Sequence, residues 1–169
     1  MTETVKYFAS LLARVEPRLA TRCRAVYDPE QDANPPGMVL SELSIAALQQ
    51  QDYQKAIGLL ERARSRMPES PMILNNLAYA YLQAETSSPD RALLLVDQAI
   101  RIANQQGISN TDFSQFLHTR GTALMQLNRL DEARGAFLEA LVGRPENIEI
   151  IESLVKCCEG SDELQAEVF

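Results

Sequence analysis

Pairs of alanines seven residues apart recur three times in this chain, each with a larger apolar residue between them. The pairs are Ala56 with Ala63, Ala92 with Ala99, and Ala133 with Ala140, and the residues between them are Leu60, Val96 and Phe137. Seven residues make about two turns of an α-helix, so each pair puts two small side chains on one helix face. The spacing predicts three helices, each approached closely by a second helix.

A second pattern stands before each alanine pair. The dipeptides Leu43-Ser44, Leu77-Ala78 and Arg120-Gly121 are preceded by Leu40, Leu74 and Leu117 and followed by Ala47, Tyr81 and Leu124, while Pro68, Asn104 and Pro145 come after the alanines. This arrangement resembles the tetratricopeptide repeat, whose 34-residue pattern is W-x2-L-G-x2-Y…A-x3-F…P. The third unit keeps the pattern best and departs from it at Leu117, Arg120 and Leu124. Extra residues fall in turns, near 86–88 and 107–113.

The resemblance implies an all-α fold, a right-handed α-solenoid of antiparallel helix pairs. Repeat units are expected at about 37–70, 71–106 and 114–147, with a capping helix at 148–158. Helices are predicted at 38–50, 53–66, 71–84, 89–106, 111–127, 130–143 and 148–158. Asp52, Ser70 and Ser88 are predicted to cap helix starts, with proline following each serine, and Gly107 and Gly143 to end helices in a left-handed conformation.

The two ends of the chain differ in charge. Residues 1–30 are predicted to form a helical segment, with helices at 3–15 and 17–27, that either caps the solenoid or folds into its groove. Residues 1–27 carry five basic and two acidic groups, whereas the whole chain has a net charge of −7. The capping helix is predicted to turn Ile151, Leu154, Val155 and Cys158 toward the third unit and to leave Cys157 at the rim. Residues 159–169 form an acidic tail.

Residues with catalytic or metal-binding chemistry are scarce. The chain has one histidine, His118, and three cysteines without metal-ligand spacing, and it lacks a glycine-rich phosphate loop. No enzyme activity, cofactor, metal or catalytic residue is therefore expected. The negative charge argues against nucleic acid as a partner. No apolar stretch reaches the roughly 18 residues of a membrane span. A cytoplasmic protein is expected, or a soluble domain of a longer anchored protein, with membrane association disfavoured.

In repeats of this family the first helix of each pair lines a concave groove that accepts peptides or partner helices. Helix geometry places a neutral set of side chains on that face. The candidate groove residues are Ile45, Gln49, Met72, Asn75, Tyr79, Gln83, His118, Thr122 and Met125. Family members that clamp the C-terminal carboxylates of chaperones use Lys, Arg and Asn there. The matching places here hold Ser41, Ile45, Tyr79, His118 and Thr122, so such a clamp is disfavoured.

These features predict a non-catalytic adaptor that binds an unidentified peptide or partner helix in the groove. The alternative is a self-assembly scaffold, or a regulatory domain of a larger protein, whose groove is filled by its own N-terminal helices. In that case a homo-oligomer is possible.

Overall fold

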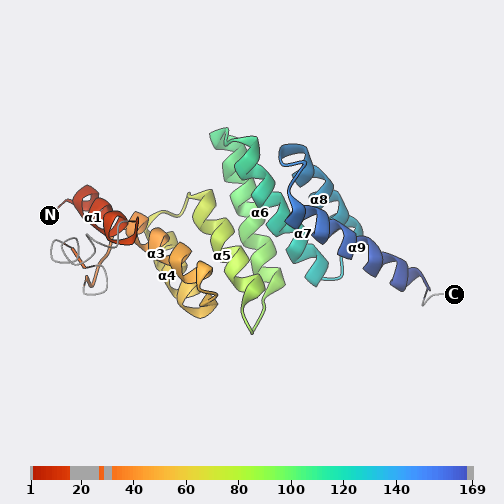
Figure 1. Ribbon diagram of the computed structural model, residues 1–169, viewed down its shortest axis with the longest axis horizontal. Coiled ribbons are helices and arrows are strands. Elements are labelled where there is room, and N and C mark those ends of the chain that lie inside the picture. The colour runs from red at the N-terminus through yellow and green to blue at the C-terminus, as the bar shows by residue number, and fades with distance from the viewer. Residues whose placement is uncertain (1, 16–26, 29–31, 167–169) are drawn as a thin grey trace. The chain divides into compact units, whose positions relative to one another are not determined.

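The computed structural model describes residues 2–15, 27–28 and 32–166, which form eight α-helices and no β-strand (Figure 1). The helices are α1 (Glu3–Val15), α3 (Gly37–Gln49), α4 (Tyr53–Arg66), α5 (Pro71–Gln83), α6 (Pro89–Gln106), α7 (Asn110–Gln126), α8 (Leu130–Gly143) and α9 (Ile148–Ala166). The all-α prediction is confirmed, and the helices of the repeat region begin within one residue of the predicted positions. The second N-terminal helix, expected at 17–27, lies almost wholly outside the described residues.

The chain divides into two compact units, Met1–Pro68 and Glu69–Phe169. The first unit contains the helix pair α3–α4 and the helix α1, and the second contains the pairs α5–α6 and α7–α8 followed by α9. None of the described helices is long and apolar enough to cross a membrane.

In the first unit, α4 packs its alanine face against α3. Ala56, Leu60 and Ala63 are fully buried, as are Val39 and Leu40 of α3. On another side of α3 lies α1, where Ala9 joins Val39 and Tyr27 in a small apolar cluster. The guanidinium of Arg14 donates to the backbone carbonyl of Glu42 and forms an ion pair of 2.6 Å with its carboxylate. Helix α1 is therefore fixed to α3 by an apolar contact and by charge.

In the second unit, small residues set the distance between paired helices. Ala92, Val96 and Ala99 of α6 and Leu74, Leu77 and Ala78 of α5 are fully buried. In the next pair, a Cβ atom added to Gly121 would lie 2.5 Å from the ring of Phe137, which is itself fully buried. A glycine at this position is thus what lets α7 and α8 approach each other around a phenylalanine.

The turns inside the pairs α3–α4 and α7–α8 are built in the same way. Gln51 and Asn128 both adopt a left-handed conformation with φ of 59°. The backbone N–H of Asp52 donates to Ala47 O at 3.0 Å, and that of Arg129 donates to Leu124 O at 2.9 Å. This shared geometry supports the alignment of the two pairs at the level of the backbone.

The predicted helix ends are partly confirmed. The carboxylate of Asp52 accepts from the N–H of Lys55 at 3.1 Å, and Gly107 ends α6 with φ of 64°. Ser70 and Ser88 stand at the cap positions before Pro71 and Pro89, but neither hydroxyl makes a capping bond, so that part of the prediction was wrong.

The prediction for Gly143 was also wrong, because it is the last residue of α8 and not a left-handed terminator. Its role is steric instead: a Cβ atom there would lie 2.6 Å from the backbone oxygen of Asn110.

The packing face of α9 differs from the predicted one by a single residue. Ile150 and Cys157, 2% and 1% exposed, pack with Leu154 into the core cluster that includes Phe137. The thiol of Cys157 donates to the carbonyl of Leu130 at 3.2 Å. Ile151 and Val155 are 40% and 50% exposed, and Cys158 is exposed. The expected roles of the two cysteines are therefore reversed, and the helix continues to Ala166.

Candidate functional site

Three helices of the second unit form one side of that unit. Helix α5 lies beside α7, and α7 beside α9, whereas the second helices of the pairs, α6 and α8, are not in contact with each other. Packing that is closer on one side than on the other curves the stack toward the closer side. The side formed by α5, α7 and α9, called here the inner face, is therefore the concave side of this unit.

Most of the predicted groove residues of the second unit lie at or near the surface. Met72 of α5 is 38% exposed and Gln83 is exposed. Tyr79, Thr122 and Met125 are half-buried, as is His118. Ile45 and Gln49, half-buried and exposed, belong to α3 in the first unit. The side chains that the second unit brings together are amides, hydroxyls, thioethers, a phenol and an imidazole, without a lysine or arginine among the predicted positions.

Asn75 is the predicted groove residue that does not reach the surface. Its side chain is 1% exposed, and its amide oxygen has no hydrogen-bond partner. A buried polar atom without a partner costs about 1–3 kcal/mol. Asn75 in this conformation is therefore not available to a partner on the inner face, although helix periodicity alone placed it there.

His118 links two helices of the inner face. Its Nε2 atom lies 3.0 Å from the hydroxyl of Ser153 on α9, and its ring centroid is 5.7 Å from that of Phe137 on α8. Burial lowers the pKa of His118 below its ordinary value of 6.5, and the nearby carboxylate of Glu149 offsets part of this effect. The imidazole is thus favoured in its neutral form, and it serves to join α7 with α9. In the described residues no group of His, Cys, Asp or Glu could hold a metal ion.

The longer turn between α5 and α6 is bonded to the inner face. The hydroxyl of Ser87 donates to Gln126 Oε1 at 2.8 Å, and Gln126 Nε2 donates to the backbone oxygen of Leu82 at 3.3 Å. The two extra residues of this turn therefore hold the end of α7 against the end of α5. Sequence reasoning could place the insertion in a turn but could not find its partner on the next helix pair.

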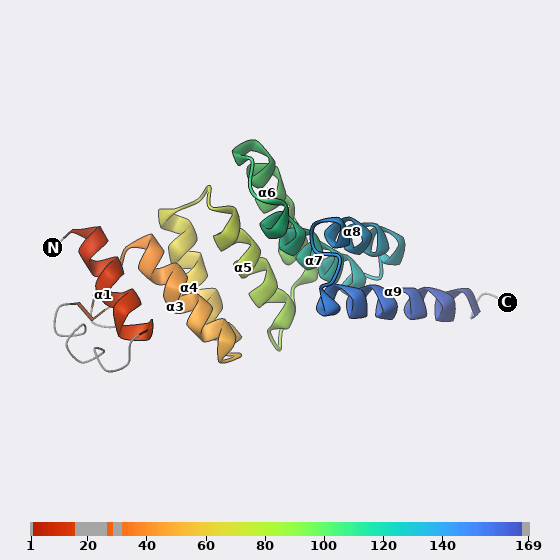
Figure 2. The ribbon, with the colours of Figure 1, turned by 45° about the horizontal axis from the view of Figure 1, so that its top comes forward.

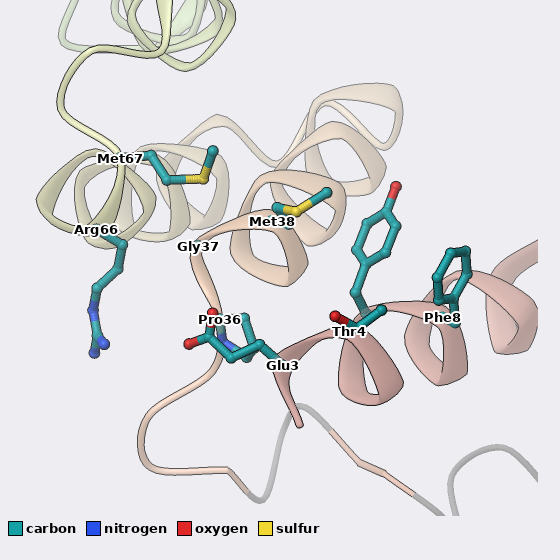
Figure 3. Close-up of a pocket in the computed structure, with 9 residues that line it drawn as sticks. Glu3, Thr4, Phe8, Pro36, Gly37, Met38, Arg66 and Met67 are labelled. Atoms are coloured by element: carbon teal, nitrogen blue, oxygen red, sulfur yellow. The ribbon is translucent and has the colours of Figure 1, made fainter. Parts of the chain in front are cut away.

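A pocket of about 620 Å³ lies in the first unit, between α1, the start of α3 and the end of α4 (Figure 3). Its walls are mainly apolar, and they carry one acidic and one basic side chain. The lining residues are Glu3, Thr4, Tyr7, Phe8, Pro36, Gly37, Met38, Arg66 and Met67. No pattern of residues indicated this pocket, because its position depends on how α1 lies against α3.

The two units differ strongly in charge. Residues 1–68 contain nine Lys and Arg against eight Asp and Glu, a net charge of +1, whereas residues 69–169 contain seven against fifteen, a net charge of −8. The net charge of the second unit as a whole therefore favours cationic groups over carboxylates.

The helix-pair geometry agrees with a comparison of the sequence with known families. The family model for the tetratricopeptide repeat matches residues 42–107, which run from α3 to the end of α6. This part of the chain therefore matches the tetratricopeptide-repeat family. A search among curated proteins found no match.

Solved tetratricopeptide-repeat domains have the same fold. The first such domain of Spaghetti (RPAP3), bound to the HSP90 peptide SRMEEVD, is 22% identical, with a TM-score of 0.63 over 75% of this chain and 93% of that one. The Sgt2 domain from Aspergillus fumigatus is 20% identical, with a TM-score of 0.64 and coverage of 82% and 83%. The second domain of human RPAP3, in complex with the HSP70 peptide SGPTIEEVD, is 24% identical, with a TM-score of 0.58 and coverage of 70% and 91%. At these identities the likeness concerns the fold.

Proposed function

We propose that this tetratricopeptide-repeat chain is a non-catalytic protein-interaction module that binds a partner segment on the inner face of the second unit. The observation that carries the proposal is the set of neutral, partly exposed side chains on two adjacent helices, α5 and α7. Amides such as Gln83 can pair with the backbone of an extended or helical partner. The thioethers of Met72 and Met125 adapt to apolar side chains of different shapes.

The charge of the second unit supports a neutral or basic partner. Its net charge is −8, and the places where relatives would carry cations for a carboxylate clamp hold His118 and Thr122. The pKa of His118 is lowered, so its imidazole does not supply a positive charge at neutral pH. A partner segment with apolar anchors and lysine or arginine at its flanks fits this surface best.

The hydrogen bonding of the single histidine supports a binding function of the chain and not a catalytic one. His118 is engaged with Ser153, whose hydroxyl in turn donates to the backbone oxygen of Glu149 at 2.8 Å. The serine proton is thus directed to a carbonyl, and the histidine is left to donate its own N–H. This is the reverse of the direction in which a histidine activates a serine nucleophile.

The alternative, a groove filled by the chain's own N-terminal helices, gains little support in the first unit. Helix α1 lies against α3 through Ala9 and Val39, and Met38 in the first turn of α3 remains 48% exposed. In that unit α1 covers the end of the helix pair and leaves an open pocket beside Met38.

The proposal can be tested by selecting peptides from a displayed random library on the wild-type chain and measuring their affinities by calorimetry. The inner-face variant combines Tyr79→Ala with Thr122→Arg, and the control is Leu94→Ser on α6, whose leucine is 72% exposed. We expect the variant to weaken the selected peptides about tenfold or more, equivalent to about 1.4 kcal/mol, and the control to bind as wild type does. Equal affinity for all three proteins would place the binding surface elsewhere and refute the proposal.

A further inference from the structure

In the second unit, α5 buries the face that it turns toward α6, and α7 buries the face that it turns toward α8. This face is formed by Leu74, Ala78 and Tyr81 of α5 and by Leu117, Gly121 and Leu124 of α7. Leu74 and Ala78 are fully buried and Tyr81 is 8% exposed, while Leu117 is 5% exposed and Leu124 is fully buried. In each case the covering element is the helix that follows in the chain.

Helix α9 has the same face, and none of the described helices covers it. The 34-residue spacing of the repeat brings Ile151, Val155 and Cys158 to the positions of Leu117, Gly121 and Leu124. Ile151 and Val155 are 40% and 50% exposed, and Cys158 is exposed. These three residues are called here the open face of α9. Figure 2 shows that the C-terminal part of α9 extends beyond α7 and α8.

At the other end of the chain, α1 has an apolar side that its own unit does not use. It occupies the place of a preceding second helix, because Ala9 packs on Val39, which corresponds in the repeat to Ile150 of α9. Val5 and Phe8 of α1 are nevertheless 45% and 53% exposed. Phe8 also lines the pocket that Met38 borders (Figure 3). Val5 and Phe8 are called here the outer face of α1.

The charges of the two ends are complementary. Among the residues whose placement is described, α1 carries two basic groups and one acidic group, a net charge of +1, and residues 148–159 carry one lysine and three acidic groups, a net charge of −2. An association between two α9 helices would bring like charges together, whereas one between α1 and α9 avoids this repulsion, since Lys6 and Arg14 of α1 are paired within their own unit.

We propose that copies of this chain associate head to tail, with the outer face of α1 from one copy covering the open face of α9 from another. The order α9, α1, α3 across the junction then repeats the alternation of first and second helices found within the chain. Because the two joined surfaces differ, each copy keeps one free surface of each kind, and the association continues into chains of copies unless it closes into a ring.

The test is sedimentation velocity over a wide range of protein concentration, with Phe8→Glu and Val155→Glu as interface variants. Val142→Glu is the matched control, because Val142 is 85% exposed on α8. Wild type and control should gain mass beyond a dimer as concentration rises, and each interface variant alone should remain a monomer. An equimolar mixture of the two interface variants should form a dimer and no larger species, since one intact α1 face and one intact α9 face remain.

Three outcomes would overturn the proposal. The first is a wild-type chain that stays a monomer at every concentration, whether its ends are free or close on each other within one molecule. The second is a Phe8→Glu variant that still dimerises while Val155→Glu does not, which would show pairing of α9 with α9. The third concerns hydrogen exchange of the wild-type chain, which does not depend on the folding of a variant. Protection that increases with concentration is expected in residues 3–15 and 148–159, and its absence there would refute the junction.

Discussion

Gly121 of α7 packs against the ring of Phe137 of α8. A methyl group at residue 121 would lie 2.5 Å from the phenylalanine ring, which is itself fully buried. We expect Gly121→Ala to lower the free energy of unfolding by about 1–3 kcal/mol, as overpacked cores do. Urea unfolding followed by circular dichroism measures the change.

Gly135 provides the matched control for this prediction. It lies on α8, and a Cβ atom there would meet nothing within 4 Å. Gly135→Ala should therefore raise the free energy of unfolding by about 0.5–1 kcal/mol, the gain in helix propensity. Two alanine variants with the same effect would show that the contact with Phe137 does not limit the approach of α7 and α8.

His118 should make the stability of the protein depend on pH. Its pKa in the folded state is below the 6.5 of the unfolded chain, so the folded state binds fewer protons. Its contribution to stability is therefore complete above about pH 6.5 and is lost as the pH falls through the unfolded value toward the folded one. Below the folded value no further loss occurs.

The measurement compares urea unfolding at about pH 7.5 and about pH 5.5 in wild type and in His118→Gln. Wild type should be less stable at the lower pH, and the variant should lose most of this difference, because the chain has no other histidine. The pKa values of Asp32 and Glu132 are lowered below 3.8 and 4.5, so these carboxyl groups stay ionised over this range. A pH dependence that persists in the variant would assign the effect to another group.

At the scale of a helix, the start of α7 depends on one side chain. The hydroxyl oxygen of Ser109 accepts from the N–H of Asp112 at 3.3 Å and donates to the Asp112 carboxylate at 2.7 Å. Ser109→Ala should cost about 1 kcal/mol of stability. Ser88→Ala at the start of α6 should have little effect, because the Ser88 hydroxyl makes no capping bond. Thermal unfolding of the two variants, compared with wild type, distinguishes the positions, and equal losses would contradict the assignment.

The sequence predicted the helices well but predicted their packing faces less well. Periodic leucine and alanine with proline after each break defined the repeat-region helices, because these signals are local. The face of α9 was predicted one residue out of register, since the positions that are buried in α5 and α7 are covered by a following helix, and the described residues place no such helix on α9. For the same reason Cys157 and Cys158 exchanged their expected environments.

The candidate site was predictable as a set of positions on helices but not as a surface. The periodicity that indicated Tyr79 and Thr122 also indicated Asn75, and only the packing of α5 reveals that Asn75 is buried. The contact of His118 with Ser153 joins residues 35 positions apart. The pocket beside Phe8 depends on the position of α1 on α3, for which the spacing of apolar residues gives no rule.

At the scale of the whole molecule, the distribution of charge predicts which peptides the chain does not bind. The relative named above is bound to the HSP90 peptide SRMEEVD, which ends in acidic groups. The second unit here has a net charge of −8, and Ser41, Ile45 and Thr122 stand where a carboxylate clamp would need cations or amides. Calorimetric titration with SRMEEVD should give no saturable binding, with the Spaghetti domain as the positive control. A Kd of about 1 μM would contradict the assignment of the inner face to neutral or basic segments.

The two matching turns at Gln51 and Asn128 make the helix pair an interchangeable building block. Each turn reverses the chain with one residue in the left-handed conformation and the same backbone hydrogen bond across the turn. The geometry of a helix pair is therefore set by residues within that pair. A variant protein in which residues 110–147 are duplicated in tandem should therefore form a longer stack of helices, with one more helix on its inner face. The chain can then be lengthened by duplication without the redesign of either end.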